Sequence, residues 1–152
     1  MSETRSRFAE SISPETRLRW LRLALRFFGG STVVLTGFLM AALVLDLSVV
    51  GEGSFLEWYF LWHPRNLAYE LMVGAMLAAW GAFLWVAARD PVRHTFFLTF
   101  SIVFLGLHAL VMAYAAAVVE GEFHHVLTDV AFLAFVAGVI LVLYPRGTAA
   151  AD

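Results

Sequence analysis

The stretch that decides the fold is residues 95–118, TFFLTFSIVFLGLHALVMAYAAAV. It contains no aspartate, glutamate, lysine or arginine, and it exceeds the about 20 apolar residues that a helix needs to cross the ~30 Å hydrocarbon core of a bilayer. Three further apolar stretches lie at residues 31–50, 67–88 and 126–144. Lipid cannot satisfy exposed backbone groups, and these unbroken runs lack the alternation of barrel strands. Each stretch is therefore predicted to be a transmembrane helix.

Composition supports a membrane protein over a water-soluble domain. The chain is 61% hydrophobic and 14% charged, with a mean hydropathy of +0.80, whereas soluble domains are roughly 45–50% apolar and about 25% charged. A chain of 152 residues leaves too much of its surface exposed to hide this apolar material from water. The absence of cysteine excludes disulfides and thiolate sites. No nucleic-acid motif, phosphate loop or serine nucleophile elbow is present, so the expected partner is the lipid bilayer and not nucleic acid.

The connections and the arginines predict the topology. Residues 89–94 and 120–125 are short polar links, which favours antiparallel neighbours. The fold class is therefore an all-α polytopic membrane protein with an up-down four-helix transmembrane bundle. Nine of the ten arginines fall on one side of this arrangement, and Arg65 alone falls on the other. Because positive residues in short flanks stay in the cytoplasm, we expect a multi-pass protein of the bacterial inner membrane with both termini cytoplasmic.

The segment before the first span carries its own helix signals. Ser13-Pro14-Glu15 is typical of a helix start, and Arg19, Arg22 and Arg26 are spaced to share one side of the helix. We expect residues 1–30 to form a cytoplasmic arm and an amphipathic interfacial helix, residues 31–146 the four-span domain, and residues 147–152 a cytoplasmic tail. The alternative is one long helix kinked at Gly29-Gly30.

Four ionisable residues fall within the predicted spans at similar depth. At ~1.5 Å per residue, Asp46, His108 and Asp129 come out ~21–23 Å above the inner face, and Glu70 comes out at ~27 Å. A charged side chain at this depth costs ~2.5–3.5 kcal/mol even on the lenient scale, so each one requires an explanation. For Asp46 alone, a small shift of the span boundary would return the side chain to the headgroups.

Helical spacing suggests which faces turn inward. Glu70 shares its face with Gly74, Ala78 and Gly81, small residues that permit close helix contact. His125 precedes Asp129 by one turn on the same side, whereas the adjacent His124 is expected to point elsewhere. The resulting hypothesis is an outward-facing pocket, roofed by the aromatic loop 51–64. Its expected lining residues are Asp46, His63, Glu70, His108, Met112, His125 and Asp129.

Three kinds of chemistry fit such a pocket. Carboxylates and imidazoles bind divalent metals, so a metal is conceivable at Glu70, His108, His125 and Asp129. Glu70, His108 and Asp129 are the candidates for acid–base catalysis, and with His63 and Met112 they are the candidates for ligand binding. The structural alternative is that these groups only hydrogen-bond across the bundle, at ~0.6 kcal/mol each.

Several motifs resemble an uncharacterised bacterial family of short four-span membrane proteins, classed as a domain of unknown function. The motifs are HPRNLAYELM at 63–72, AARDPVRH at 87–94, LHALVM at 107–112, Thr128-Asp129 and LYPR at 143–146. The resemblance covers residues 30–146 and departs from the family pattern at Thr128, where glycine is expected. It implies that the Tyr69-Glu70 pair, His108 and Asp129 belong to a shared pattern, and it implies no activity.

Two classes of function remain open. The first is a non-catalytic protein that binds a metal, a proton or a small polar ligand, either as a homo-oligomer or as an accessory subunit of a membrane complex. The second is a small lipid-active enzyme of the acid–base isomerase type. The enzyme requires a large apolar cavity that reaches the carboxylates.

Overall fold

A computed structural model describes residues 13–145 of the chain. The first twelve residues of the expected arm and the whole expected tail lie outside the described residues. Arg5, Arg7 and Arg146 lie outside them as well. The described part consists of helices joined by turns and loops and contains no strand. Its elements are α2 (Pro14–Val44), η1 (Ser48–Val50), α3 (Phe55–Phe60), α4 (Leu67–Ala87), α5 (Thr95–Val118), η2 (Glu122–Val126) and α6 (Asp129–Leu143).

Helix α2 corrects the prediction for the N-terminal region. Ser13 is its N-cap and accepts a hydrogen bond from the Thr16 N–H, and Pro14 is the first helical residue, as predicted. The helix then continues without a break through Gly29-Gly30 to Val44. The prediction of a separate interfacial helix is therefore wrong, and the alternative of one long helix is found. The two glycines are explained by packing, because a Cβ on Gly29 would lie 2.6 Å from the carbonyl oxygen of Gly81.

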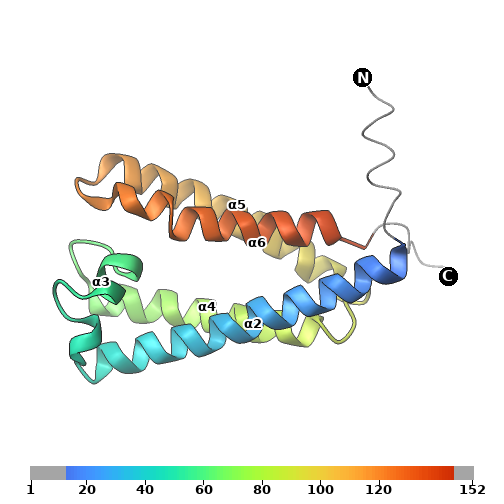
Figure 1. The fold of residues 1–152 in the computed structure, drawn as a ribbon, viewed down its shortest axis with the longest axis horizontal. Coiled ribbons are helices and arrows are strands. Elements are labelled where there is room, and N and C mark those ends of the chain that lie inside the picture. The colour runs from blue at the N-terminus through green and yellow to red at the C-terminus, as the bar shows by residue number, and fades with distance from the viewer. Residues whose placement is uncertain (1–12, 146–152) are drawn as a thin grey trace.

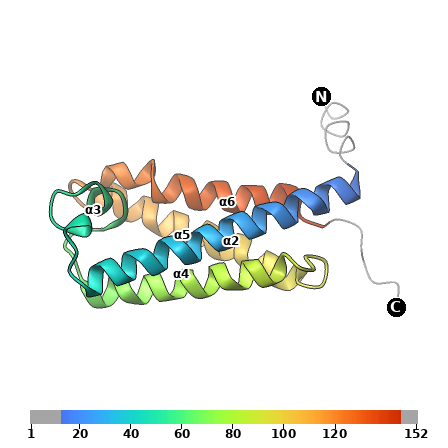
Figure 2. The ribbon, with the colours of Figure 1, turned by 60° about the horizontal axis from the view of Figure 1, so that its bottom comes forward.

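The four long helices form two antiparallel pairs. Helix α2 packs mainly on α4, α5 packs mainly on α6, and α2 also contacts α6. Figures 1 and 2 show the pairs side by side, with α3 and the loops around it at the end opposite the start of α2 and the end of α6. This arrangement confirms the up-down bundle.

The four helices are those expected to cross a membrane. Each of the spans Pro14–Val44, Leu67–Ala87, Thr95–Val118 and Glu122–Leu143 is long and apolar enough to do so. Between 22% and 28% of the most apolar window of each is buried inside the protein, so most of each helix presents apolar side chains outward. Because water would penalise such a surface, the chain is a multi-pass membrane protein.

The packed core lies in the half of the bundle near the α2 N-terminus. Leu25, Leu84, Leu98, Val136 and Ile140 come from all four helices and are almost fully buried. Trp80 of α4 donates a 3.1 Å hydrogen bond to the Ser101 hydroxyl of α5 in the same cluster. Toward the other end the helix pairs diverge (Figure 1), which leaves room for the cavity described next.

Candidate ligand-binding site

A cavity of about 620 Å³ lies between the two helix pairs. Its walls are mostly apolar side chains of α2, α4, α5 and α6, and residues 60–64 and Asn66, from the end of α3 and the loop after it, contribute to one end. The volume falls within the ~300–1,000 Å³ of small-molecule sites, which combine apolar walls with a few placed polar groups. The cavity is thus large enough for an amphipathic molecule.

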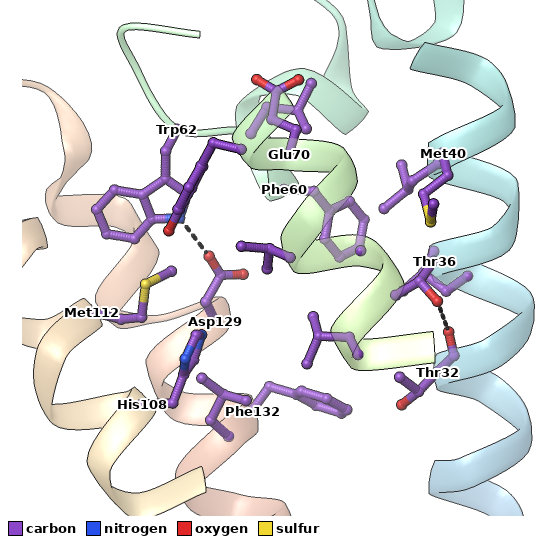
Figure 3. Close-up of a pocket in the computed structure, with 18 of the residues that line it drawn as sticks. Thr32, Thr36, Met40, Phe60, Trp62, Glu70, His108, Met112, Asp129 and Phe132 are labelled. Carbon is purple, nitrogen blue, oxygen red and sulfur yellow. Dashed lines mark hydrogen bonds between the residues drawn. The ribbon is translucent and has the colours of Figure 1, made fainter. Parts of the chain in front are cut away.

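Asp129 supplies a polar group at the wall formed by α6. It is the first residue of that helix, and its Oδ2 accepts a 2.9 Å hydrogen bond from the indole N–H of Trp62. The same oxygen lies 2.9 Å from Nδ1 of His125, whose ring stacks on Trp62 with centroids 4.2 Å apart. Figure 3 shows the second carboxylate oxygen facing the interior of the cavity. Two neighbours therefore hold one oxygen of Asp129, while the other oxygen faces the space.

His108 and Glu70 are further polar residues in the lining of the cavity. The His108 ring packs 5.9 Å from Phe104, and no residue in the part of the chain that the structure describes forms a hydrogen bond with it. Glu70 is paired through Oε1 with Arg65 at 3.5 Å, but its buried Oε2 lacks a hydrogen-bond partner among the described residues. Figure 3 shows the Glu70 carboxylate separate from that of Asp129. These groups line one cavity without forming hydrogen bonds to one another, so the bundle leaves part of their hydrogen-bonding capacity unused.

The other predicted site residues divide into two sets. His63 and Met112 line the cavity with Glu70, His108 and Asp129. His125 does not line it, because its fully buried ring lies behind Asp129. Asp46 is a correction: α2 ends at Val44, so Asp46 lies in the following turn at φ 50 with an exposed side chain.

The expected four-residue metal set is not assembled. Among residues 13–145, the group of three or more potential ligands whose atoms all lie within 4.8 Å of one another is Glu122, His124 and His125. Glu70 and His108 belong to no such group. The burial of the two adjacent histidines agrees with the expectation that only one of them turns inward. His125 is fully buried, whereas His124 is half-buried. Both nevertheless belong to the same cluster, and Trp58 of α3 stacks on the His124 ring.

Sequence reasoning missed a chain of alternating carboxylates and imidazoles beside the cavity. His63 lies between two buried acids, with Nε2 3.1 Å from Glu57 Oε1 and Nδ1 3.2 Å from Glu122 Oε1. The other oxygen of Glu122 lies 3.0 Å from His125 Nε2, and His125 continues to Asp129. The spacing of Glu122 and His125, three residues apart, was a readable signal. Nothing in the sequence joined Glu57 to them.

Glu57 is held as a charged group at the outer end of this chain. The backbone N–H of Gly53 donates a 2.8 Å hydrogen bond to its Oε2. This bond lowers the pKa of Glu57 below its ordinary value of 4.5, more than burial raises it, and His63 and Arg65 lower it further. The positive φ of Gly53 (77°) allows the turn that brings this N–H to the carboxylate.

Comparisons with known proteins place the chain in a family. A search of curated proteins and a search of solved structures each gave no significant match. The model of a family of unknown function (DUF6632) matches residues 18–150, which confirms the resemblance to a domain of unknown function. Since the match covers most of the sequence, the chain belongs to this family of unknown function.

Proposed function

We propose that the protein binds an amphipathic small molecule in the cavity between the helix pairs, with the apolar body along the helices and a polar head at Glu70, His108 and Asp129. The single observation that carries this proposal is a mostly apolar 620 Å³ cavity whose lining includes Glu70, His108 and Asp129. One buried oxygen of Glu70 lacks a hydrogen-bond partner among the described residues. Buried polar groups are normally hydrogen-bonded, so unpaired ones in a cavity favour a missing partner.

The charges on the cavity wall favour a particular kind of head group. Asp129 and Glu70 offer carboxylate oxygens, which accept hydrogen bonds when ionised. Arg65 is the cation that pairs with Glu70, whereas the polar partners of the Asp129 carboxylate among residues 13–145 are the Trp62 indole N–H and the His125 imidazole. A hydroxyl or ammonium group on the ligand would donate to these oxygens. We therefore assign the ligand to the class of apolar molecules with a hydrogen-bond-donating head.

The experiment is mass spectrometry of small molecules extracted from purified protein in lipid nanodiscs. Leu77→Trp would fill the cavity, and Met76→Trp, on the exposed side of the same helix, is the matched control. We expect a discrete molecule at about one per chain in the native protein and the control, and its loss from Leu77→Trp. Extracts that contain only bulk membrane lipids, in equal amounts for all three proteins, would overturn the proposal.

A second candidate function is proton transfer to or from the bound molecule. The observation that favours it is that Asp129 and His108 both line the same large apolar cavity, the geometry that a lipid-active acid–base enzyme requires. Incubation of the native protein with the extracted ligand in D2O would then place deuterium on a carbon atom of the ligand, where it survives return to H2O, and Asp129→Asn and His108→Ala would abolish this exchange. If the ligand carries no deuterium on carbon after the incubation, the result supports binding without proton transfer.

The membrane and the orientation are part of the proposal. The start of α2, the α4–α5 link and the end of α6 lie at one end of the bundle, and they carry Arg17, Arg19, Arg22, Arg26, Arg89 and Arg93 among the described residues. The positive-inside rule places this end in the cytoplasm. The polar end of the cavity then lies near the outer face of a bacterial inner membrane.

A further inference from the structure

A second cluster of polar side chains lies behind Asp129, outside the cavity wall. Glu122, His124 and His125 belong to the short helix η2, and each can offer one ligand atom within 4.8 Å of the other two. Glu122 and His125 are buried, and His124 is half-buried. Imidazole and carboxylate are the ligands preferred by zinc and neighbouring divalent transition metals.

The inner pair of this cluster lacks a hydrogen bond despite its short distance. Glu122 Oε2 and His125 Nε2 lie 3.0 Å apart, yet both are buried atoms without a hydrogen-bond partner among the described residues. The side chain of His125 is 0% exposed and that of Glu122 is 4% exposed, so water cannot readily satisfy them. A cation bound by both atoms would remove the penalty of leaving two buried polar atoms unpaired.

Each member of the pair is oriented through its other polar atom. His125 Nδ1 lies 2.9 Å from Asp129 Oδ2, an arrangement that keeps the ring proton on Nδ1 and leaves a lone pair on Nε2. Glu122 Oε1 lies 3.2 Å from His63 Nδ1, which leaves Oε2 for a ligand. Metal-bound histidines generally donate their second N–H to a carboxylate or carbonyl in this way. The surroundings of both residues therefore match those of metal ligands.

His124 can supply a third ligand. Its two ring nitrogens lie 2.6 Å from the Trp58 carbonyl oxygen and 3.1 Å from the Gly121 carbonyl oxygen. A neutral imidazole has a single N–H, so it can donate to only one of these carbonyls. The other nitrogen keeps a lone pair that can turn to a metal. The ring already packs against His125, with centroids 4.2 Å apart.

We propose that Glu122, His124 and His125 bind one divalent transition-metal ion of the Zn²⁺ type, with His63 and Asp129 as positioning residues. The three ligand residues lie outside the cavity lining, although the positioning residues His63 and Asp129 take part in both sites. The proposal does not depend on the cavity ligand. Three protein ligands leave a fourth position of a tetrahedral ion for water.

The test is metal binding by full-length protein that is purified in detergent through a histidine-free tag and stripped with a chelator. Zn²⁺ affinity is measured by competition with a chromophoric chelator, and Co²⁺ absorption in the visible range reports the ligand geometry. We expect about one equivalent for the native protein. Affinity should fall at least ~100-fold in Glu122→Gln and His124→Gln and about 10–100-fold in His63→Ala, which changes a residue outside the ligand set.

His94→Ala is the matched control, because His94 lies at the start of α5, at the opposite end of the bundle. It should bind Zn²⁺ like the native protein. His124→Gln keeps the test valid if loss of the buried Glu122 carboxylate prevents folding, since His124 is only half-buried. Native protein that binds no Zn²⁺, or a His124→Gln variant with native affinity and native Co²⁺ absorption, would overturn the proposal.

Failure of this proposal is distinguishable from failure of the cavity proposal. Glu122 and His124 do not line the cavity, so folded His124→Gln protein should retain the extracted small molecule. Leu77→Trp, in turn, should retain Zn²⁺ affinity.

Discussion

At the residue scale, a buried polar atom without a hydrogen bond costs free energy, and this cost separates two kinds of polar group in the bundle. Trp80 and Ser101 illustrate the satisfied case, because the indole N–H donates to the hydroxyl inside the packed half of the bundle. Glu70 illustrates the unsatisfied case, since one buried oxygen lacks a donor. The Trp80–Ser101 pair stabilises the fold, whereas the Glu70 oxygen is one that the proposed ligand would satisfy.

The Trp80–Ser101 pair gives a stability prediction. Ser101→Ala leaves the buried indole N–H without its acceptor, and we expect the protein to lose about 1–3 kcal/mol of stability. Trp80→Phe in the same background removes the donor as well, so the double variant should lose less than the sum of the two single variants. Thermal unfolding in detergent measures this cycle. Additive losses would show that the hydrogen bond contributes nothing.

Glu57 gives a prediction for the pH dependence of stability. Its pKa in the folded protein is lowered below 4.5 by the Gly53 N–H and by His63, so its contribution is fully present above pH 4.5 and is lost as pH falls through the lower folded value. The native protein should unfold at a higher temperature than Glu57→Gln at neutral pH. The difference should shrink in acid. A difference that stays constant to well below pH 4.5 would contradict the assignment.

The residues that sequence reasoning found and those it missed differ in a physical way. Glu70, His108 and Asp129 could be identified because an ionisable group in an apolar span is costly and therefore conspicuous. Glu57 could not be identified, because an acid in a polar loop is ordinary and only the folded loop buries it, whereas Glu122 could be found only through its three-residue spacing from His125. Trp62 belongs to the aromatic loop 51–64 that is predicted to roof the pocket, but its hydrogen bond to Asp129 joins residues far apart in sequence and could not be predicted.

At the scale of the element, glycines determine how closely α2 and α4 approach. A Cβ on Gly29 would lie 2.6 Å from the Gly81 carbonyl oxygen, and a Cβ on Gly81 would lie 2.9 Å from the Gly29 carbonyl oxygen. The small-residue face of 67–88 could be predicted from spacing. The partner glycines in α2 are instead predicted to end an interfacial helix or to kink a longer one, because sequence alone does not distinguish a flexible glycine from one selected for close contact.

This crossing gives a prediction with a control in the same helix. Gly29→Ala should lower stability by about 1–3 kcal/mol, because the added methyl meets backbone that cannot move freely. Gly37→Ala adds a methyl where no atom lies within 4 Å, so stability should stay the same or rise slightly. Thermal unfolding of the two variants provides the comparison. Equal effects would contradict the close packing of α2 on α4.

At the scale of the whole molecule, the topology follows from apolar length and arginine bias together. The start of α4, the end of α4 and both ends of α5 lie within one residue of the predicted bounds. The first span differs more, since α2 begins at Pro14 and ends at Val44. The first span ends at Val44 and not at residue 50, because the residues after Val44 turn toward α3. Most of these residues are still apolar, so hydropathy does not reveal the end of the helix.

The orientation can be tested by single-cysteine labelling, because the chain contains no cysteine. Glu52→Cys lies in the exposed loop before α3 and Arg93→Cys in the exposed α4–α5 link. A membrane-impermeant maleimide should label Glu52→Cys in intact cells and Arg93→Cys only after the membrane is opened. The reverse pattern would invert the proposed topology.

The central claim is that the cavity between the helix pairs holds a specific amphipathic molecule. The most direct measurement is photocrosslinking with benzoylphenylalanine at Phe132, which lines the cavity, and at Phe135, an exposed residue of α6 that does not line it. After irradiation in native membranes, intact-protein mass spectrometry should show one discrete adduct mass at position 132 and a spread of phospholipid masses at position 135. The same spread of phospholipid masses at both positions would contradict the claim.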